Sequence, residues 1–115
     1  MKLLIKEQYM EEEFYFVDFK NVGCDRDVHK ALKDGLHFTD YYGDNLDALW
    51  DTLTDMMNYN AVITLQNFDH LEELDAAGAQ SIYRLFVDLK HYSDDFFYDK
   101  IKIYILRHGI PEEIL

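Results

Sequence analysis

Three short segments of β-forming residues, spaced far apart along the chain, restrict the possible folds most strongly. They are rich in β-branched and aromatic residues and cover residues 14–19, 61–65 and 101–106. The stretches between them are long enough for helices and carry apolar residues at helical spacing. Strands that alternate with helices are typical of α/β folds, in which right-handed crossovers bring the strands together as a parallel sheet. The sequence therefore predicts an α/β domain with a parallel sheet.

The first helix is expected to follow the first strand directly. Asp25 or Arg26 can open it, and Val28 and Leu32 then fall on one apolar face. Gly35 is placed to end it, because a helix commonly stops at a glycine in the left-handed conformation.

Two further helical segments are expected between the second and third strands. Residues 68–74 fit a short helical turn, and Asp75 begins a clearly amphipathic helix. The apolar face of that helix is formed by Ile82, Leu85, Phe86 and Leu89. This spacing indicates core packing.

The stretch that reads YYGDNLDALWDTLT, residues 41–54, contains the strongest signal for the start of a helix. Gly43 permits a turn with positive φ, and Asp44 or Asn45 can accept hydrogen bonds from the first free N–H groups of the helix. The helix is therefore expected to begin within a residue of Asp44. Its apolar face is formed by Leu46, Leu49, Trp50, Leu53, Met56 and Met57.

A second line along this helix consists of acids alone, because Asp47, Asp51 and Asp55 recur at every fourth position. Asp47 has an ordinary explanation, since an acid in the first turn complements the positive end of the helix dipole. Asp51 and Asp55 lack this explanation, and like charges four residues apart cost roughly 0.2–0.5 kcal/mol per pair. A solvated face accounts for charge, but not for charge of one sign.

The segment 41–54 resembles the helix-opening segment of the barstar family, the intracellular inhibitors of secreted bacterial ribonucleases. The similarity continues without a gap from about Phe14 to His91 and includes residues 27–33 and 78–81. It implies an α/β fold with a small three-stranded parallel sheet packed by about four helices.

The resemblance also implies a partner-binding site. Asp51 would occupy the phosphate site of the ribonuclease, and Asp47 would pair with a neighbouring basic group. Asp88 matches a family glutamate that makes a peripheral ion pair, although its side chain is shorter. Met56 replaces a second family tryptophan, which suggests a shifted partner preference. The residues expected around the two central acids are Tyr41, Gly43, Asn45, Trp50 and Thr54.

The composition of the chain limits its partners and its location. The chain has 115 residues and a formal charge of −12. This negative charge argues against binding to nucleic-acid phosphates and favours a basic partner or simple solubility. A single cysteine, Cys24, expected to be a half-buried thiol, excludes an internal disulfide. No signal-peptide pattern and no apolar run near ~20 residues is present. We expect a soluble cytoplasmic protein.

We expect one domain over residues 1–115, in which 1–13 and 107–115 are terminal extensions. The first extension could be an added edge strand, a tail or a dimer contact. Residues 94–98 form an acidic and aromatic insertion before the third strand.

The chain carries no recognisable catalytic motif, phosphate loop or cofactor motif. The five histidines show no metal-ligand spacing, and His29 is expected at the surface or its boundary. Asp47, Asp51 and Asp88 could bind a hard cation, but aspartates four apart on a helix are far commoner as a solvated face. The sequence therefore predicts a non-enzymatic 1:1 inhibitor of a small basic extracellular ribonuclease, without a cofactor. The alternative is an acidic regulatory module that binds another basic protein.

Overall fold

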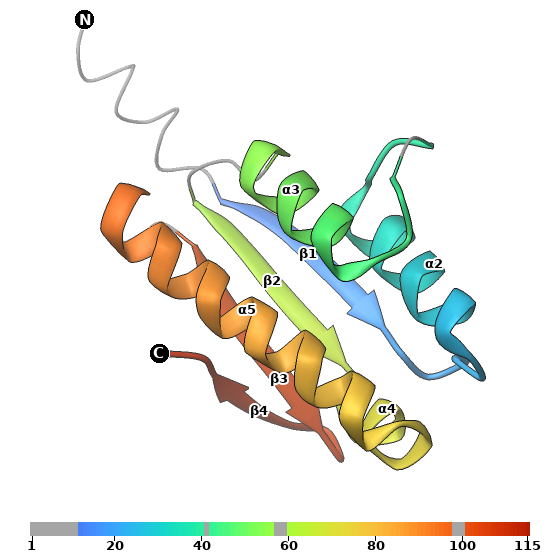
Figure 1. Cartoon of the computed structure of the whole chain (residues 1–115). Coiled ribbons are helices and arrows are strands. Elements are labelled where there is room, and N and C mark those ends of the chain that lie inside the picture. The colour runs from blue at the N-terminus through green and yellow to red at the C-terminus, as the bar shows by residue number, and fades with distance from the viewer. Residues whose placement is uncertain (1–11, 41, 57–59, 98–100) are drawn as a thin grey trace, which may run out of the picture.

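The structure, a computed structural model, describes residues 12–40, 42–56, 60–97 and 101–115. These residues form a mixed α/β fold around a four-stranded sheet (Figure 1). Strands β1 (Glu13–Asp18), β2 (Ala61–Gln66) and β3 (Lys102–Arg107) are adjacent and parallel, with Tyr15 in register with Ile63, and Ile63 with Ile103. The α/β class and the three parallel strands predicted from the sequence are confirmed.

The C-terminal residues add a fourth strand, β4 (Ile110–Glu113), which runs antiparallel to β3. The prediction of three strands and a terminal appendage was wrong here. His108 and Gly109 join the two strands with φ angles of 52° and 76°, the positive values that a tight two-residue hairpin requires. Ile114, which directly follows β4, is also buried. Its backbone N–H donates to the carbonyl of Ile103 over 2.8 Å and extends the pairing of the chain end with β3.

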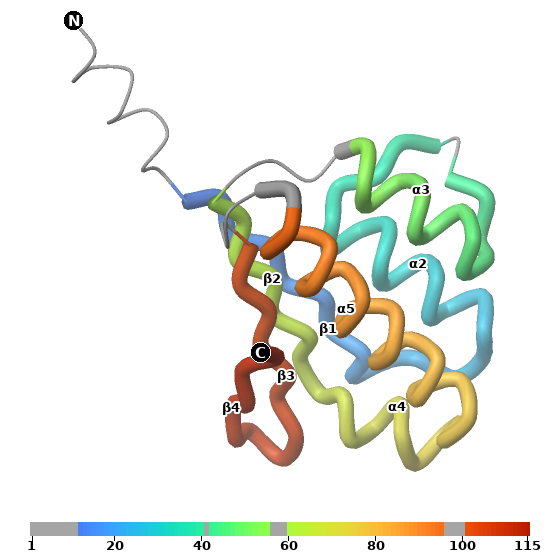
Figure 2. The backbone as a smooth tube through the Cα atoms, turned by 60° about the vertical axis from the view of Figure 1, so that its left-hand side comes forward, coloured from blue at the N-terminus to red at the C-terminus, as the bar shows by residue number. Residues whose placement is uncertain are grey.

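The long helices cover one face of the sheet. Helices α2 (Asp25–Leu36), α3 (Leu46–Met56) and α5 (Ala76–Phe97) lie together on this face, and the short α4 (Phe68–Leu74) follows the end of β2 (Figures 1 and 2). Tyr15 and Val17 point towards the helices and are buried, whereas Phe14 and Phe16 are more than half exposed, at 56% and 54%. The alternation shows that β1 has one packed and one open face.

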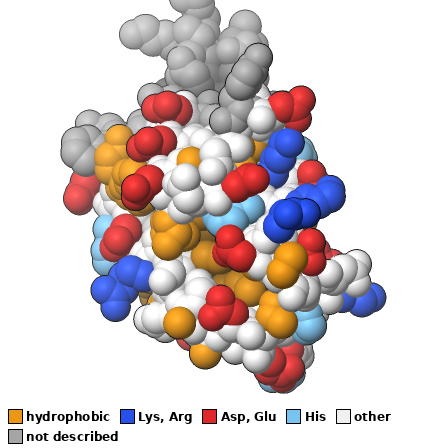
Figure 3. All heavy atoms as spheres, turned by 45° about the vertical axis from the view of Figure 1, so that its right-hand side comes forward, with side chains coloured by type: hydrophobic (Ala, Val, Ile, Leu, Met, Phe, Trp, Pro, Cys, Tyr) orange, Lys and Arg blue, Asp and Glu red, His pale blue; other side chains and the backbone are white. Residues whose placement is uncertain are grey.

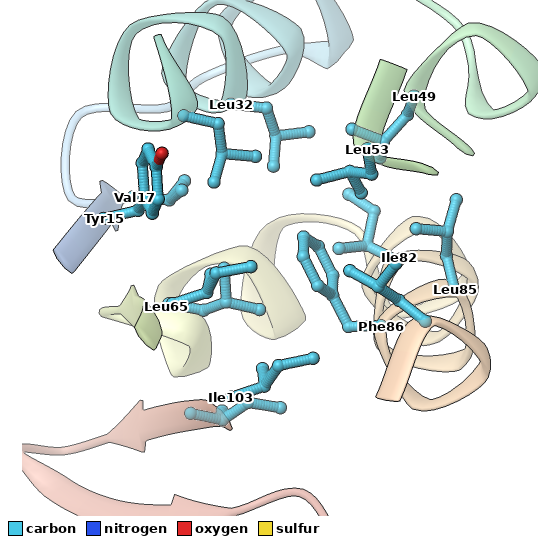
Figure 4. Close-up of a cluster of buried hydrophobic side chains, with 14 of the residues drawn as sticks. Tyr15, Val17, Leu32, Leu49, Leu53, Leu65, Ile82, Leu85, Phe86 and Ile103 are labelled. Carbon is cyan, nitrogen blue, oxygen red and sulfur yellow. The ribbon is translucent and has the colours of Figure 1, made fainter. Parts of the chain in front are cut away.

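The hydrophobic core lies between the sheet and the helices. Leu65 of β2 and Ile103 of β3 extend towards side chains from the helices (Figure 4). Leu32 of α2, Leu53 of α3 and Phe86 of α5 are fully buried in this layer. Because α3 contributes Leu49 and Leu53 to the core, its opposite side is turned to solvent.

The sequence suggested that Gly35 ends α2, and this prediction was wrong. The helix continues to Leu36, and His37 takes the left-handed conformation, with a φ of 60°. A Cβ atom on Gly35 would clash with the carbonyl oxygen of Phe16 and lie 2.8 Å from Cα of Val17. The glycine therefore allows α2 to approach β1 closely.

Two further local predictions are corrected by the structure. Cys24 precedes α2 with an extended backbone, and its thiol is exposed instead of half-buried. The segment expected as an insertion at 94–98 continues α5 as far as Phe97, while Tyr98 lies outside the described residues. Lys90, which is buried, donates to the carbonyl of Ile101 over 2.8 Å and forms an ion pair with Asp94 at 3.2 Å.

Candidate functional site

Asn45 forms the cap at the start of α3. Its Oδ1 accepts a hydrogen bond from the backbone N–H of Ala48 at 2.8 Å, and its Nδ2 donates to the carbonyl of Gly43 at 3.2 Å. One amide side chain thus satisfies a free N–H of the first turn and holds the preceding loop. Of the two caps that the sequence allowed, the structure selects Asn45.

Positive φ occurs at Asp44 and not at Gly43, where it was predicted. Asp44 has a φ of 56°, a conformation that aspartate tolerates better than most residues. A Cβ atom on Gly43 would lie 3.1 Å from Cβ of Ala48, which is tighter than ordinary contact. The glycine is therefore explained by the close approach of the loop to α3.

Tyr42 anchors the loop to α2. Its hydroxyl shares a 2.6 Å hydrogen bond with Nδ1 of His29, and its ring lies 5.0 Å from that of Phe38. Both Tyr42 and His29 are buried, and burial, reinforced by the charge of Asp44, raises the pKa of the Tyr42 hydroxyl far above its usual range. Tyr42, and with it the described start of the loop, is thus held against α2.

The prediction that His29 lies at the surface was wrong. The signal was present in the sequence, because His29, Leu32 and Leu36 follow at spacings of three and four residues and so share one face of the helix. Histidine is intermediate in its tendency to be buried, so the face to which it belongs is a better guide than its residue type.

The acidic stripe formed by Asp47, Asp51 and Asp55 is exposed on α3. Within the described part of the chain, no lysine, arginine or histidine forms an ion pair with any of the three. Figure 3 shows the face that carries α2 and α3, on which acidic side chains are spread between hydrophobic ones and the basic side chains lie towards the margins. The stripe therefore presents negative charge that no cation among the described residues neutralises.

Trp50 and Thr54 lie beside the stripe with little freedom. Trp50 is partly buried, and its ring meets that of Tyr92 on α5 edge-on, with 5.7 Å between centroids. The hydroxyl of Thr54 donates to the backbone carbonyls of Trp50 at 2.9 Å and Asp51 at 3.2 Å. The ring contact packs α3 against α5, whereas the Thr54 hydrogen bonds lie within α3 and fix the orientation of its hydroxyl.

Asp88 is exposed on α5, one helical turn before Tyr92. Residues four apart share a helix face, so Asp88 lies on the side of α5 that meets α3. The structure thus places Gly43, Asn45, Asp47, Trp50, Asp51 and Thr54 on one loop and helix, with Asp88 on the neighbouring helix. Tyr41 lies outside the described residues.

The described residues contain no group of three or more His, Cys, Asp or Glu side chains placed to hold a metal ion. Asp47, Asp51 and Asp88 therefore do not form such a group. In the same part of the chain, no helix combines the length and the apolar character needed to span a bilayer.

Comparison with known proteins identifies the family of the chain. The family model described as "Barstar (barnase inhibitor)" matches residues 12–102. The chain belongs to the barstar family. The matched range includes the whole loop, α3 and Asp88, whereas residues 1–11 and 103–115, which contain most of β3 and all of β4, lie outside it. The resemblance drawn from the sequence is confirmed.

One curated relative is the Bacillus subtilis (strain 168) protein named "Putative ribonuclease inhibitor YrdF". It is 48% identical over 52 residues, which cover 45% of this chain and 54% of the relative. The chain thus spans about half the length of the curated relative that it matches. Family membership favours an inhibitor over an enzyme.

Proposed function

We propose that this protein inhibits a small basic extracellular ribonuclease by forming a 1:1 complex in which the loop 41–45 and α3 cover the active site of the enzyme. The observation that carries the proposal is the exposed acidic stripe, which pairs with no cation among the described residues, on a helix whose position is set by the core. Family membership supports the same conclusion, because the matching model describes an inhibitor of this kind.

The chemistry of the enzyme explains why carboxylates suit this task. A ribonuclease must hold phosphate with arginine, lysine and histidine, and the same groups can donate charge-assisted hydrogen bonds to a carboxylate. Asp51 lies at the middle of α3 and would enter the phosphate site, while Asp47, one turn earlier, would pair with a neighbouring cation. Asp88 would add a peripheral ion pair.

Preorganisation of the loop and helix favours tight binding. The Asn45 cap, the buried Tyr42–His29 hydrogen bond and the contact between Trp50 and Tyr92 fix the site in the free protein. Little conformational entropy would then be lost on association, and the cost of ordering a loop is a large part of the cost of binding. Gly43 and Tyr41 would contact the enzyme next to the two acids.

The protein would act in the cytoplasm as an immunity-type inhibitor, without hydrolytic activity of its own. The test is a panel of small basic ribonucleases assayed on RNA with increasing inhibitor, with and without divalent metal. We expect cleavage by at least one enzyme to stop at equimolar inhibitor. If none is inhibited at micromolar protein, the proposal is contradicted, and the alternative of an acidic module that binds another basic protein is favoured. RNA cleavage by the protein itself would exclude the proposal.

A further inference from the structure

A small cleft opens beside the start of α3, where the first turns of α2 and α5 also meet. Its volume is about 110 Å³, and its apolar lining includes Val28, Leu71 and Ile82. Binding sites for small molecules usually measure about 300–1,000 Å³. A single side chain from a partner is therefore a better match in size than a cofactor.

Two carboxylates border the cleft. Asp25 of α2 and Asp75, which caps α5 by accepting from the N–H of Gly78 at 3.0 Å, both line it and are exposed. The helix N-termini here carry roughly half a positive charge each, whereas every carboxylate carries a full negative charge. The acids therefore dominate, and the cleft combines an apolar floor with a negative rim. Lysine and arginine have this character, because a long aliphatic stem ends in a cation.

A buried histidine, His29, lines the same cleft. The side chain of His29 is only 6% exposed, and its Nδ1 is already bonded to Tyr42. Its Nε2 lies 3.8 Å from a carboxylate oxygen of Asp25, which is beyond hydrogen-bond distance. In the tautomer in which Nδ1 carries the ring proton and donates it to the hydroxyl oxygen of Tyr42, Nε2 has a free lone pair. An entering cation could then donate a hydrogen bond to Nε2.

The cleft adjoins the proposed recognition surface. Leu46, which is 39% exposed, lines it, and in the chain Leu46 stands between the cap Asn45 and Asp47. An enzyme that covers the loop and α3 would therefore reach the mouth of the cleft with the residues bordering its own active site.

We propose that this cleft is an accessory subsite that accepts one lysine or arginine side chain of the ribonuclease and so helps to decide which enzyme is inhibited. The proposal rests on the proposed function for the identity of the partner. The cation would lie between Asp25 and Asp75, donate to Nε2 of His29, and extend its stem over Val28 and Ile82.

Two substitutions test the subsite against a matched control. Asp25→Asn removes one carboxylate, and Ser81→Lys places a cation of the protein itself at the lining of the cleft. Asp34→Asn is the control, because it removes the same charge from α2 nine residues later, two and a half turns away and thus on the opposite side. Urea unfolding of all three variants confirms that each is folded.

The first measurement is the dissociation rate of the complex with a ribonuclease that the wild-type protein inhibits. Because Asp25 is exposed, we expect Asp25→Asn to accelerate dissociation by about two- to fivefold and Ser81→Lys by at least as much. Asp34→Asn should leave the rate unchanged. Double-mutant cycles with each lysine and arginine around the enzyme's active site should reveal one residue coupled to Asp25. Equal rates for Asp25→Asn and Asp34→Asn, or purely additive cycles, would overturn the subsite.

The second measurement needs no ribonuclease. n-Butylammonium is titrated into the wild-type protein, and the nuclear magnetic resonances of His29 and Ile82 are followed with n-butanol as the uncharged reference. We expect saturable shifts with the ammonium that Ser81→Lys abolishes. If butanol produces the same shifts, or neither compound does, the cleft does not select cations. This experiment separates the two proposals. If the protein binds the ammonium but inhibits no ribonuclease, the proposed function is refuted, whereas the cation-accepting cleft is supported.

Discussion

Replacing Asp51 with alanine should raise the free energy of unfolding of the uncomplexed protein and weaken its inhibition of the ribonuclease. Asp51 is exposed in the middle of α3, and its carboxylate has no ion-pair partner among the described residues. The hydroxyl of Thr54 donates to the backbone carbonyl of Asp51 and not to its side chain, so the substitution retains this hydrogen bond. The change therefore removes no stabilising contact of the described structure.

The expected gain in stability follows from two local terms. Alanine is favoured over aspartate inside a helix by about 0.6 kcal/mol. The substitution also relieves repulsion from Asp47 and Asp55, each one turn away, at roughly 0.2–0.5 kcal/mol per pair before screening by salt and solvent. After that discount, the free energy of unfolding should rise by about 0.5–1 kcal/mol. The melting temperature should rise by roughly 2–5 °C.

Binding should change in the opposite direction. In the complex the enzyme's cations would remain buried without their partner, and removal of one member of a buried ion pair costs about 3–5 kcal/mol. The affinity should therefore fall by roughly a hundredfold or more. Urea unfolding and inhibition titrations measure the two effects separately. If Asp51→Ala unfolds more easily than the wild-type protein and inhibits equally well, the carboxylate is structural and the site is wrongly assigned.

The remaining predictions concern the cap, the packing of α2, the steering of the partner and the buried tyrosine. Asn45→Ala should lower the free energy of unfolding by about 1 kcal/mol, whereas Asp44→Asn, which keeps a residue that tolerates positive φ, should change it less in the same urea titration, because Asn45 is the cap. Gly35→Ala should destabilise by more than ~2 kcal/mol, since the added methyl group meets β1 backbone, and a wild-type urea midpoint would refute this explanation. Association with the ribonuclease, followed by stopped flow, should slow markedly from ~10 mM to ~500 mM salt, and a constant rate would exclude steering. Because the folded protein raises the pKa of Tyr42, stability should decline as the pH rises above ~10, where the unfolded tyrosine ionises, and Tyr42→Phe should remove that part of the decline.

The sequence by itself determined the three parallel strands, most of the helices and the acidic character of α3. Strands and helices follow from the spacing of apolar residues, which is a local property, so the three parallel strands, the helix that begins after Asn45 and the line of Asp47, Asp51 and Asp55 could all be predicted. The family resemblance around Trp50 pointed to a partner in the same way, because it depends on the order of residues within one segment.

The tertiary structure decided what depends on contacts between distant parts of the chain. Gly35 is needed because β1 lies against α2, and nothing within the helix itself reveals that contact. The pattern of α2 places His29 on the apolar face, but its hydrogen-bond partner there, the hydroxyl of Tyr42 13 residues later, is supplied by another segment. β4 exists because β3 offers a free edge to the residues that follow it. In each case the deciding interaction joins separate elements, and a local pattern contains no information about which elements will meet.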